Sequence, residues 1–211
     1  MDPIFTTPTG QPSQVGEPTW EMAHYFPKQG HWTEVSFMRL AAPHRFELAN
    51  GRLELLPMPT WFHQQVIEYL FDCLRAYLRT NNIGRTVFAP FFVRLSSSEI
   101  RQPDLTFVRH EKVDADRHKA QEGADLVMEV VVQGELNRER DVVEKRSAYA
   151  VAGITEYWII DPEARSISVL SLGADGAYQV TGEYREGEQA ASVLLPGFTV
   201  DVRETFKAGE Q

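Results

Sequence analysis

The fold of this chain is decided by residues 124–162, ADLVMEVVVQGELNRERDVVEKRSAYAVAGITEYWIIDP. The pattern predicts a strand over residues 124–133, a helix over 137–152 and a second strand over 155–161. Gly153 is a natural end for the helix, because glycine readily adopts the left-handed conformation found where helices stop. A strand, a helix and a strand in this order indicate an α/β core.

Glu129 stands in the middle of the first predicted strand. Every other residue from Leu126 to Val132 is apolar, so we expect this strand to be central in its sheet and covered on both faces. An unpaired carboxylate buried there would be costly or would take up a proton. Glu129 therefore needs a partner, which is a metal ion, a lysine, a set of hydrogen-bond donors or, in a purely structural role, an arginine.

Asp104 and Lys145 are candidates to join Glu129. Asp104 enters a short strand in RQPDLTFV, and if that strand is a neighbour, the two carboxylates converge on one divalent cation. Hard oxygen ligands favour Mg²⁺ or Mn²⁺. Lys145 lies on the helix that packs back on the sheet, where its ammonium can reach the carboxylates. Two plainer interpretations stay open: Asp104 caps a turn after Pro103, and Lys145 forms a solvated pair with Asp141, four residues earlier.

Composition narrows the class of protein. A chain of 211 residues fits one domain with extensions. The net charge of -9 argues against a generic nucleic-acid coat protein, which would be basic, but it is compatible with a nuclease. The single cysteine, Cys73, excludes a disulfide within the chain. No apolar run approaches the length of about 18 residues that spans a bilayer, and the N-terminus lacks a signal-peptide pattern, so we expect a cytoplasmic protein.

The rest of the chain gives weaker signals. Residues 1–32 contain five prolines and are expected to form an arm before a domain over 33–211. Thr33 starts a short helix, and Asn50-Gly51 predicts a hairpin turn. A helix over 60–80 carries His63, which is more often a surface or capping group than a ligand. RTVFAPFFVRLSS predicts one strand, and SISVLSL, AYQVTGEYREGE and SVLLPGFTVDV predict strands in the tail.

These segments together resemble the PD-(D/E)XK nuclease superfamily. The most similar members form a large bacterial family of restriction endonuclease-like proteins of unknown substrate. The matching pieces run in order from about Thr33 to Phe206: FELANGRLE, His63, QPDLTFV, LVMEVVV, DVVEKRSAYAVAGITEYWIIDP and SVLLPGFTVDV. The resemblance implies a restriction-endonuclease-like fold, with a mixed β-sheet flanked by helices and additional β-hairpins.

The resemblance also implies a site. Asp104 and Glu129 would be ligands of Mg²⁺ or Mn²⁺, and Lys145 would be the lysine of the site. In the superfamily's usual pattern the lysine stands two residues after the second acid, where this chain has Val131. The family resembled tends to supply the lysine from the next helix, as Lys145 would. Further positions that match family-typical residues, and are possible accessory groups, are Glu47, His63 and Asp141.

The function implied is metal-dependent hydrolysis of DNA phosphodiester bonds, with DNA as the partner and a homodimer possible. Arginines that could contact the phosphate backbone, each also an ordinary surface residue, are Arg94, Arg101, Arg138, Arg140 and Arg146. A second hypothesis is a non-catalytic module that binds nucleic acid or protein on a nuclease scaffold. It is favoured by the acidic total and by VVQGE at 131–135, where the family commonly has a Ser-Pro-Ser-like segment.

Overall fold

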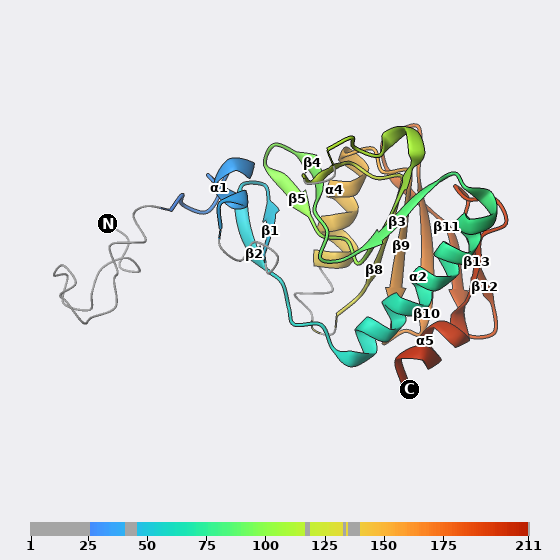
Figure 1. Cartoon of the computed structure of the whole chain (residues 1–211). Coiled ribbons are helices and arrows are strands. Elements are labelled where there is room, and N and C mark those ends of the chain that lie inside the picture. The colour runs from blue at the N-terminus through green and yellow to red at the C-terminus, as the bar shows by residue number, and fades with distance from the viewer. Residues whose placement is uncertain (1–25, 41–45, 117–118, 133, 135–139, 211) are drawn as a thin grey trace.

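The computed structural model describes residues 26–40, 46–116, 119–132, 134 and 140–210, with the backbone alone for Arg140 and Asp141. A mixed six-stranded sheet lies at the centre with helices on both faces, and a smaller sheet stands beside it (Figure 1). This confirms the predicted α/β fold. No helix in these ranges combines the length and apolar character needed to cross a membrane.

The large sheet has the strand order β11-β10-β9-β8-β6-β3. Its strands are β3 (Gly84–Phe88), β6 (Leu105–Arg109), β8 (Leu126–Val130), β9 (Glu156–Asp161), β10 (Ser166–Leu172) and β11 (Tyr178–Arg185). β8 and β9 run parallel, and the other neighbours are antiparallel. The strands predicted to carry Asp104 and Glu129 are therefore direct neighbours.

All five residues of β8 are buried, as predicted. Leu126, Met128 and Val130 pack in the core beneath α2 (Trp61–Asn81) and α5 (Val202–Glu210). Val127 points to the opposite face, where α4 (Lys145–Val151) lies. Figure 1 shows α2 in front of this sheet and α4 behind it. Glu129, which shares a face with Val127, consequently points toward α4.

The smaller sheet has the order β2-β1-β5-β4-β7. Its strands are β1 (Phe46–Ala49), β2 (Arg52–Leu55), β4 (Val93–Ser96), β5 (Glu99–Arg101) and β7 (Gln121–Glu122). Its core contains Phe37 from α1 (Glu34–Met38), together with Trp32, Leu48 and Ile100. The predicted β1–β2 hairpin is confirmed, with positive φ at Asn50 (49°) and Gly51 (71°). Residues 30 and 32 donate backbone hydrogen bonds of 2.8 and 2.9 Å to the carbonyl oxygen of Gly51.

We expect Gly51→Ala to destabilise the protein more than Gly176→Ala. Both glycines have positive φ, 71° and 77°, which costs an alanine about 1–2 kcal/mol. A Cβ at Gly51 would in addition lie 2.7 Å from the carbonyl oxygen of Gly30, whereas one at Gly176 would meet nothing within 4 Å. Urea denaturation of the two variants measures the difference in unfolding free energy. Equal losses of unfolding free energy would show that the segment 26–32 moves away from the added Cβ without cost.

The structure differs from the sequence-based expectation in three places. RTVFAPFFVRLSS forms two strands in two sheets, β3 and β4, with a cis Ala89–Pro90 bond between them. The tail was expected to form strands, but it ends in the helix α5, in which Val202, Phe206 and Gly209 are buried at helical spacing. The segment SVLLPGFTVDV contributes the short strand β13 (Thr199–Asp201), which pairs with β12 (Gln189–Ala191). The helix expected over 137–152 is described from residue 140 on, as a π-helical segment η5 (Arg140–Glu144) that leads into α4.

Candidate active site

A cavity of about 220 Å³ opens where β6 begins and β8 ends. The charged and titratable side chains that line it are His63, Asp104, Glu129 and Lys145. Four of the six residues predicted for the site therefore come together in one space, and Glu47 lies close behind them, as described below. For Asp141 the side chain lies outside the described residues.

Asp104 directly precedes β6 and is held against β8. The pairing of Leu105 with Met128, continued by one residue, places Asp104 opposite Glu129. The Oδ2 atom of Asp104 accepts a hydrogen bond of 2.8 Å from the backbone N–H of Val130. This contact runs to the neighbouring strand and not to a local turn after Pro103, so strand register fixes the position of the carboxylate.

His63 also belongs to this cavity. Its Nε2 atom lies 3.2 Å from Asp104 Oδ2, and its side chain is only 12% exposed. The helix is capped by Thr60, whose hydroxyl accepts from the backbone N–H of His63. Of the interpretations open for His63, its position in the cavity against Asp104 agrees with an accessory residue and not with an open surface position.

Glu129 makes two contacts with α4. Its Oε2 atom lies 2.9 Å from Nζ of Lys145, and its Oε1 accepts a hydrogen bond of 2.5 Å from the hydroxyl of Tyr149. Lys145 and Tyr149 are four residues apart, so they share one face of the helix. All three side chains are buried, with Lys145 only 3% exposed. Among the described residues, Glu129 is therefore partnered by a lysine and a phenol. The burial of Lys145 shows that its side chain is not solvated.

Tyr149 was not recognised as a site residue from the sequence. Burial raises the pKa of its phenol well above the ordinary value, and the charges of Glu129 and Glu47 raise it further. Tyr149 therefore keeps its proton at neutral pH and acts as a hydrogen-bond donor to Glu129. The sequence showed only that it shares a helix face with Lys145, and nothing local indicated its contact with the strand.

Glu47, on β1, is fully buried behind the cavity. Its Oε1 accepts a hydrogen bond of 2.7 Å from the backbone N–H of Gln102, and its Oε2 lies 3.1 Å from Nη1 of Arg101. Burial alone would raise the pKa of Glu47, but the charges of Lys145 and Arg101 outweigh it, and the pKa lies below its ordinary value. Glu47 therefore belongs to the same group of charges as Lys145.

The lowered pKa of Glu47 predicts a pH-dependent contribution to stability. The ionised carboxylate stabilises the fold above its ordinary pKa of 4.5, and this contribution is lost as the pH falls through the lower folded value. The difference in unfolding free energy between wild type and Glu47→Gln should therefore shrink as the pH falls from neutral toward 3. Urea denaturation across this range measures it, with Glu111→Gln, an exposed change, as the control. A difference independent of pH would contradict the assignment.

The arginines predicted to contact DNA are largely engaged elsewhere. Arg101 is 2% exposed and bonded to Glu47, Glu54 and Glu99, so its prediction as a phosphate contact is wrong. Three carboxylates on different strands surround Arg101. Because two of these strands, β1 and β2, are distant from Arg101 in the sequence, the residues next to Arg101 do not indicate that it is buried. Of the others, Arg94 pairs with two carboxylates and Arg146 donates to the carbonyl oxygen of residue 178. Arg138 and the side chain of Arg140 lie outside the described residues.

The cavity suits a hard divalent cation by the chemistry of its donors. Asp104 and Glu129 present carboxylate oxygens from adjacent strands. Within the described ranges no group of three or more His, Cys, Asp or Glu side chains is arranged to hold a metal ion. A set of two matches the usual binding of Mg²⁺, which is held by one or two carboxylates and completes its shell with waters and substrate phosphates. The two predicted ligands therefore fit the ion.

Comparisons with known proteins agree with the resemblance to restriction endonuclease-like proteins. A family model named Uma2 and described as "Putative restriction endonuclease" matches residues 34–203. No curated protein matches the chain. Among solved structures, a "putative nuclease belonging to DUF820" from Anabaena variabilis ATCC 29413 matches with a TM-score of 0.69 at 14% sequence identity, over 87% of this chain and 99% of that chain. This likeness shows a shared fold. Because the family model spans most of the sequence, the resemblance is confirmed, and the chain belongs to the Uma2 family of putative restriction endonucleases.

Proposed function

We propose that this protein is a metal-dependent endonuclease that hydrolyses phosphodiester bonds in DNA. One observation carries the proposal: a single cavity holds carboxylates from two adjacent strands and a buried lysine whose Nζ lies 2.9 Å from one of them. Membership of a restriction endonuclease-like family supports a nuclease. Asp104 and Glu129 would hold Mg²⁺ or Mn²⁺.

Each residue has a distinct task in this proposal. A bound divalent ion supplies Lewis-acid chemistry, polarising the phosphate and making a water molecule more acidic. Lys145 presents a positive charge to the cavity, where it orients the attacking water or stabilises negative charge that grows on the phosphate. Its burial strengthens this effect, because charges interact more strongly away from bulk water.

Three further residues act through these groups. His63 lies against Asp104 and restricts that carboxylate. Tyr149 holds one oxygen of Glu129, and Glu47 contributes a negative charge that interacts with the charge of Lys145. We regard them as positioning residues. Hydrolysis by attack of water needs no covalent intermediate, so none of the described residues is required as a nucleophile.

Two measurements test the proposal. The full chain should nick supercoiled plasmid DNA with Mg²⁺ or Mn²⁺ and stop when EDTA is added. Calorimetric titration with Mn²⁺ should show binding to wild type that weakens about 10- to 100-fold or more in Asp104→Asn, because a ligand is lost. Nicking that continues in EDTA would overturn the metal dependence. No cleavage of the plasmid or of a single DNA strand with either ion, despite intact Mn²⁺ binding, would favour the non-catalytic binding module instead.

A further inference from the structure

The mouth of the catalytic cavity is apolar. Besides the residues of the site, its walls include Leu56, Pro57, Met58, Pro59, Ala89 and Pro90. Among the described residues that line it, the basic groups are Lys145 and His63, and each lies against a carboxylate. Proteins that grip duplex DNA through its backbone do so with arginines and lysines on their surface. The described part of this mouth has the opposite character.

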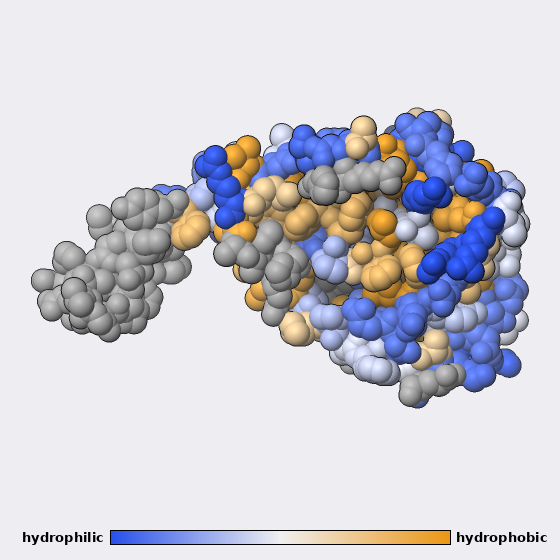
Figure 2. All heavy atoms as spheres, viewed as in Figure 1, coloured by the Kyte–Doolittle hydropathy of each residue, from blue (hydrophilic) through white to orange (hydrophobic). Residues whose placement is uncertain are grey.

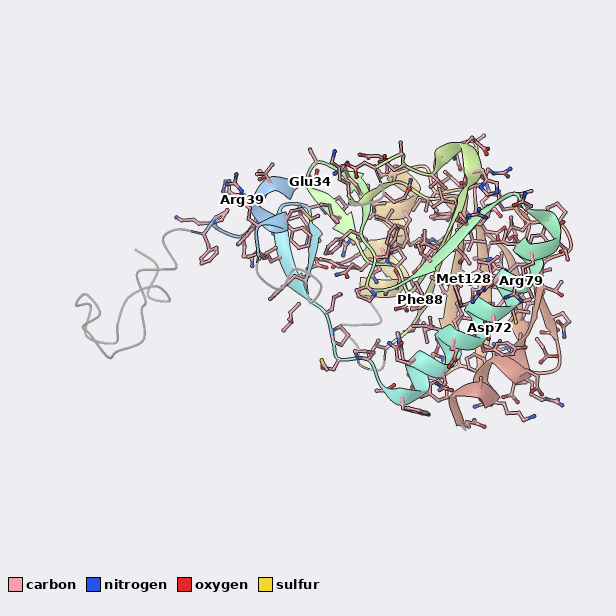
Figure 3. The ribbon with its side chains drawn as sticks, viewed as in Figure 1. Glu34, Arg39, Asp72, Arg79, Phe88 and Met128 are labelled. Atoms are coloured by element: carbon pink, nitrogen blue, oxygen red, sulfur yellow. The ribbon has the colours of Figure 1, made fainter. Side chains whose placement is uncertain are left out.

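Large apolar side chains continue outward from the mouth and form what we call the apolar rim: Leu55, Met58, Trp61 and Phe88, which are 63, 66, 71 and 50% exposed. Trp61 is the first residue of α2 and lies one turn from Gln64, which lines the cavity. Phe88, labelled in Figure 3, ends β3 directly before Ala89 and Pro90. Figure 2 shows apolar side chains gathered in the hollowed middle of this face, between the β1–β2 hairpin and α2.

A second cavity of about 390 Å³ adjoins the first. The two share Met58, His63, Val130 and Val132 in their walls. Its volume lies within the range of about 300–1,000 Å³ that is usual for sites of small organic molecules. Its one arginine, Arg165, already pairs with two surface glutamates. The space beside the candidate catalytic carboxylates is therefore mostly apolar and large enough for an organic ring.

We infer that the apolar rim and the second cavity bind unpaired bases, and that the substrate is single-stranded or locally unpaired DNA. The faces of bases are open to aromatic and apolar side chains only when the strand is unpaired, and such stacking is independent of sequence. The net charge of -9 works against long-range attraction of any nucleic acid, and most against a duplex, whose two strands together carry about one charge per 1.7 Å of axis. This inference rests on the proposed function, because it takes the bound molecule to be a DNA strand.

DNA binding measured without divalent metal tests this inference separately from catalysis, because the proposed hydrolysis needs the metal ion. Fluorescence anisotropy would compare a labelled oligonucleotide that lacks self-complementarity with the same strand in a duplex, using the full chain. We expect the single strand to bind at least about tenfold more tightly, and Trp61→Ala to weaken that binding about tenfold, in line with the loss of one stacked base. Trp61→Phe should retain most of the affinity. Val151→Ala, an 88% exposed apolar change on α4 outside the rim, is the matched control.

Several results would overturn the inference. Duplex binding as tight as single-strand binding is one, and a Trp61→Ala variant that binds the single strand like wild type is another. If Trp61→Ala changes the oligomeric state by light scattering and leaves DNA binding unaltered, the rim joins two copies of the chain instead. Single-strand binding that depends on Trp61, without any hydrolysis in Mg²⁺ or Mn²⁺, would refute the proposed function and the assignment of a substrate, and would support only the binding of unpaired bases by the rim.

Discussion

Replacing Lys145 by methionine is expected to lower the rate of plasmid nicking by a factor of about 10²–10³, the usual loss when one preorganised group that stabilises developing charge is removed. Lys145 is 3% exposed and its Nζ lies 2.9 Å from Glu129. Methionine fills much of the same space but leaves the cavity without the ammonium. Substrate affinity should change less than the rate, because the lysine acts mainly on charge that appears during the reaction.

The comparison needs a variant that removes a lysine outside the cavity. Lys112 lies 2.6 Å from Asp125, a carboxylate next to β8, and its side chain is 52% exposed. Lys112→Met should therefore nick at nearly the wild-type rate. Circular dichroism at the assay temperature checks that Lys145→Met is folded, because breaking a buried pair costs about 3–5 kcal/mol. A folded Lys145→Met variant within threefold of wild type would remove Lys145 from the mechanism.

Replacing Arg101 by methionine is expected to lower the free energy of unfolding by about 3–5 kcal/mol, because buried carboxylates lose their counter-charge. The Nη1 atom of Arg101 lies 3.1 Å from Glu47 and 2.8 Å from Glu54, and its Nε atom lies 2.7 Å from Glu99. Burial lowers the pKa of this guanidinium, but the three carboxylates more than offset that effect and raise it above its ordinary value. The cluster ties three strands of the smaller sheet together.

Urea denaturation near pH 7 measures this loss. Arg94→Met is the matched control, since Arg94 also pairs with two carboxylates but is partly exposed, as are its partners. Partly exposed pairs contribute about 0–1 kcal/mol, so the control should lose little. Similar losses in the two variants would mean that the Arg101 cluster is no more stabilising than an ordinary surface pair.

The central part of the fold follows from local patterns. The apolar run around Glu129 is short and rich in β-branched valines, which is typical of a covered strand, and Asn50-Gly51 suits the positive φ values of a tight hairpin turn. The acids could be assigned to one site because Asp104 and Glu129 stand on strands that pair directly. Here the resemblance and the physical argument from burial led to the same residues.

What was missed depends on contacts between distant segments. Arg101 looks like a surface arginine until Glu47, Glu54 and Glu99 are brought around it by three strands. His63 is placed on Asp104 by the packing of α2 over the sheet, across 41 positions of the chain. α5 was hidden because its first apolar residues continue the pattern of β13. In each case the sequence pattern indicates the local element, but it does not indicate which distant segment the element contacts.

The two acids and the lysine of the site are positioned in different ways, and the junction of η5 and α4 is where the lysine is positioned. The acids are set by strand pairing in the core, whereas Lys145 is the first residue of α4, directly after the π-helical turn. Deleting one residue from that turn would rotate Lys145 by about 100° around the helix axis and leave both acids in place. Under the proposed function, a change in chain length that alters no charged residue would therefore abolish activity, and insertions or deletions between Arg140 and Glu144 are the variants in which to look for this loss.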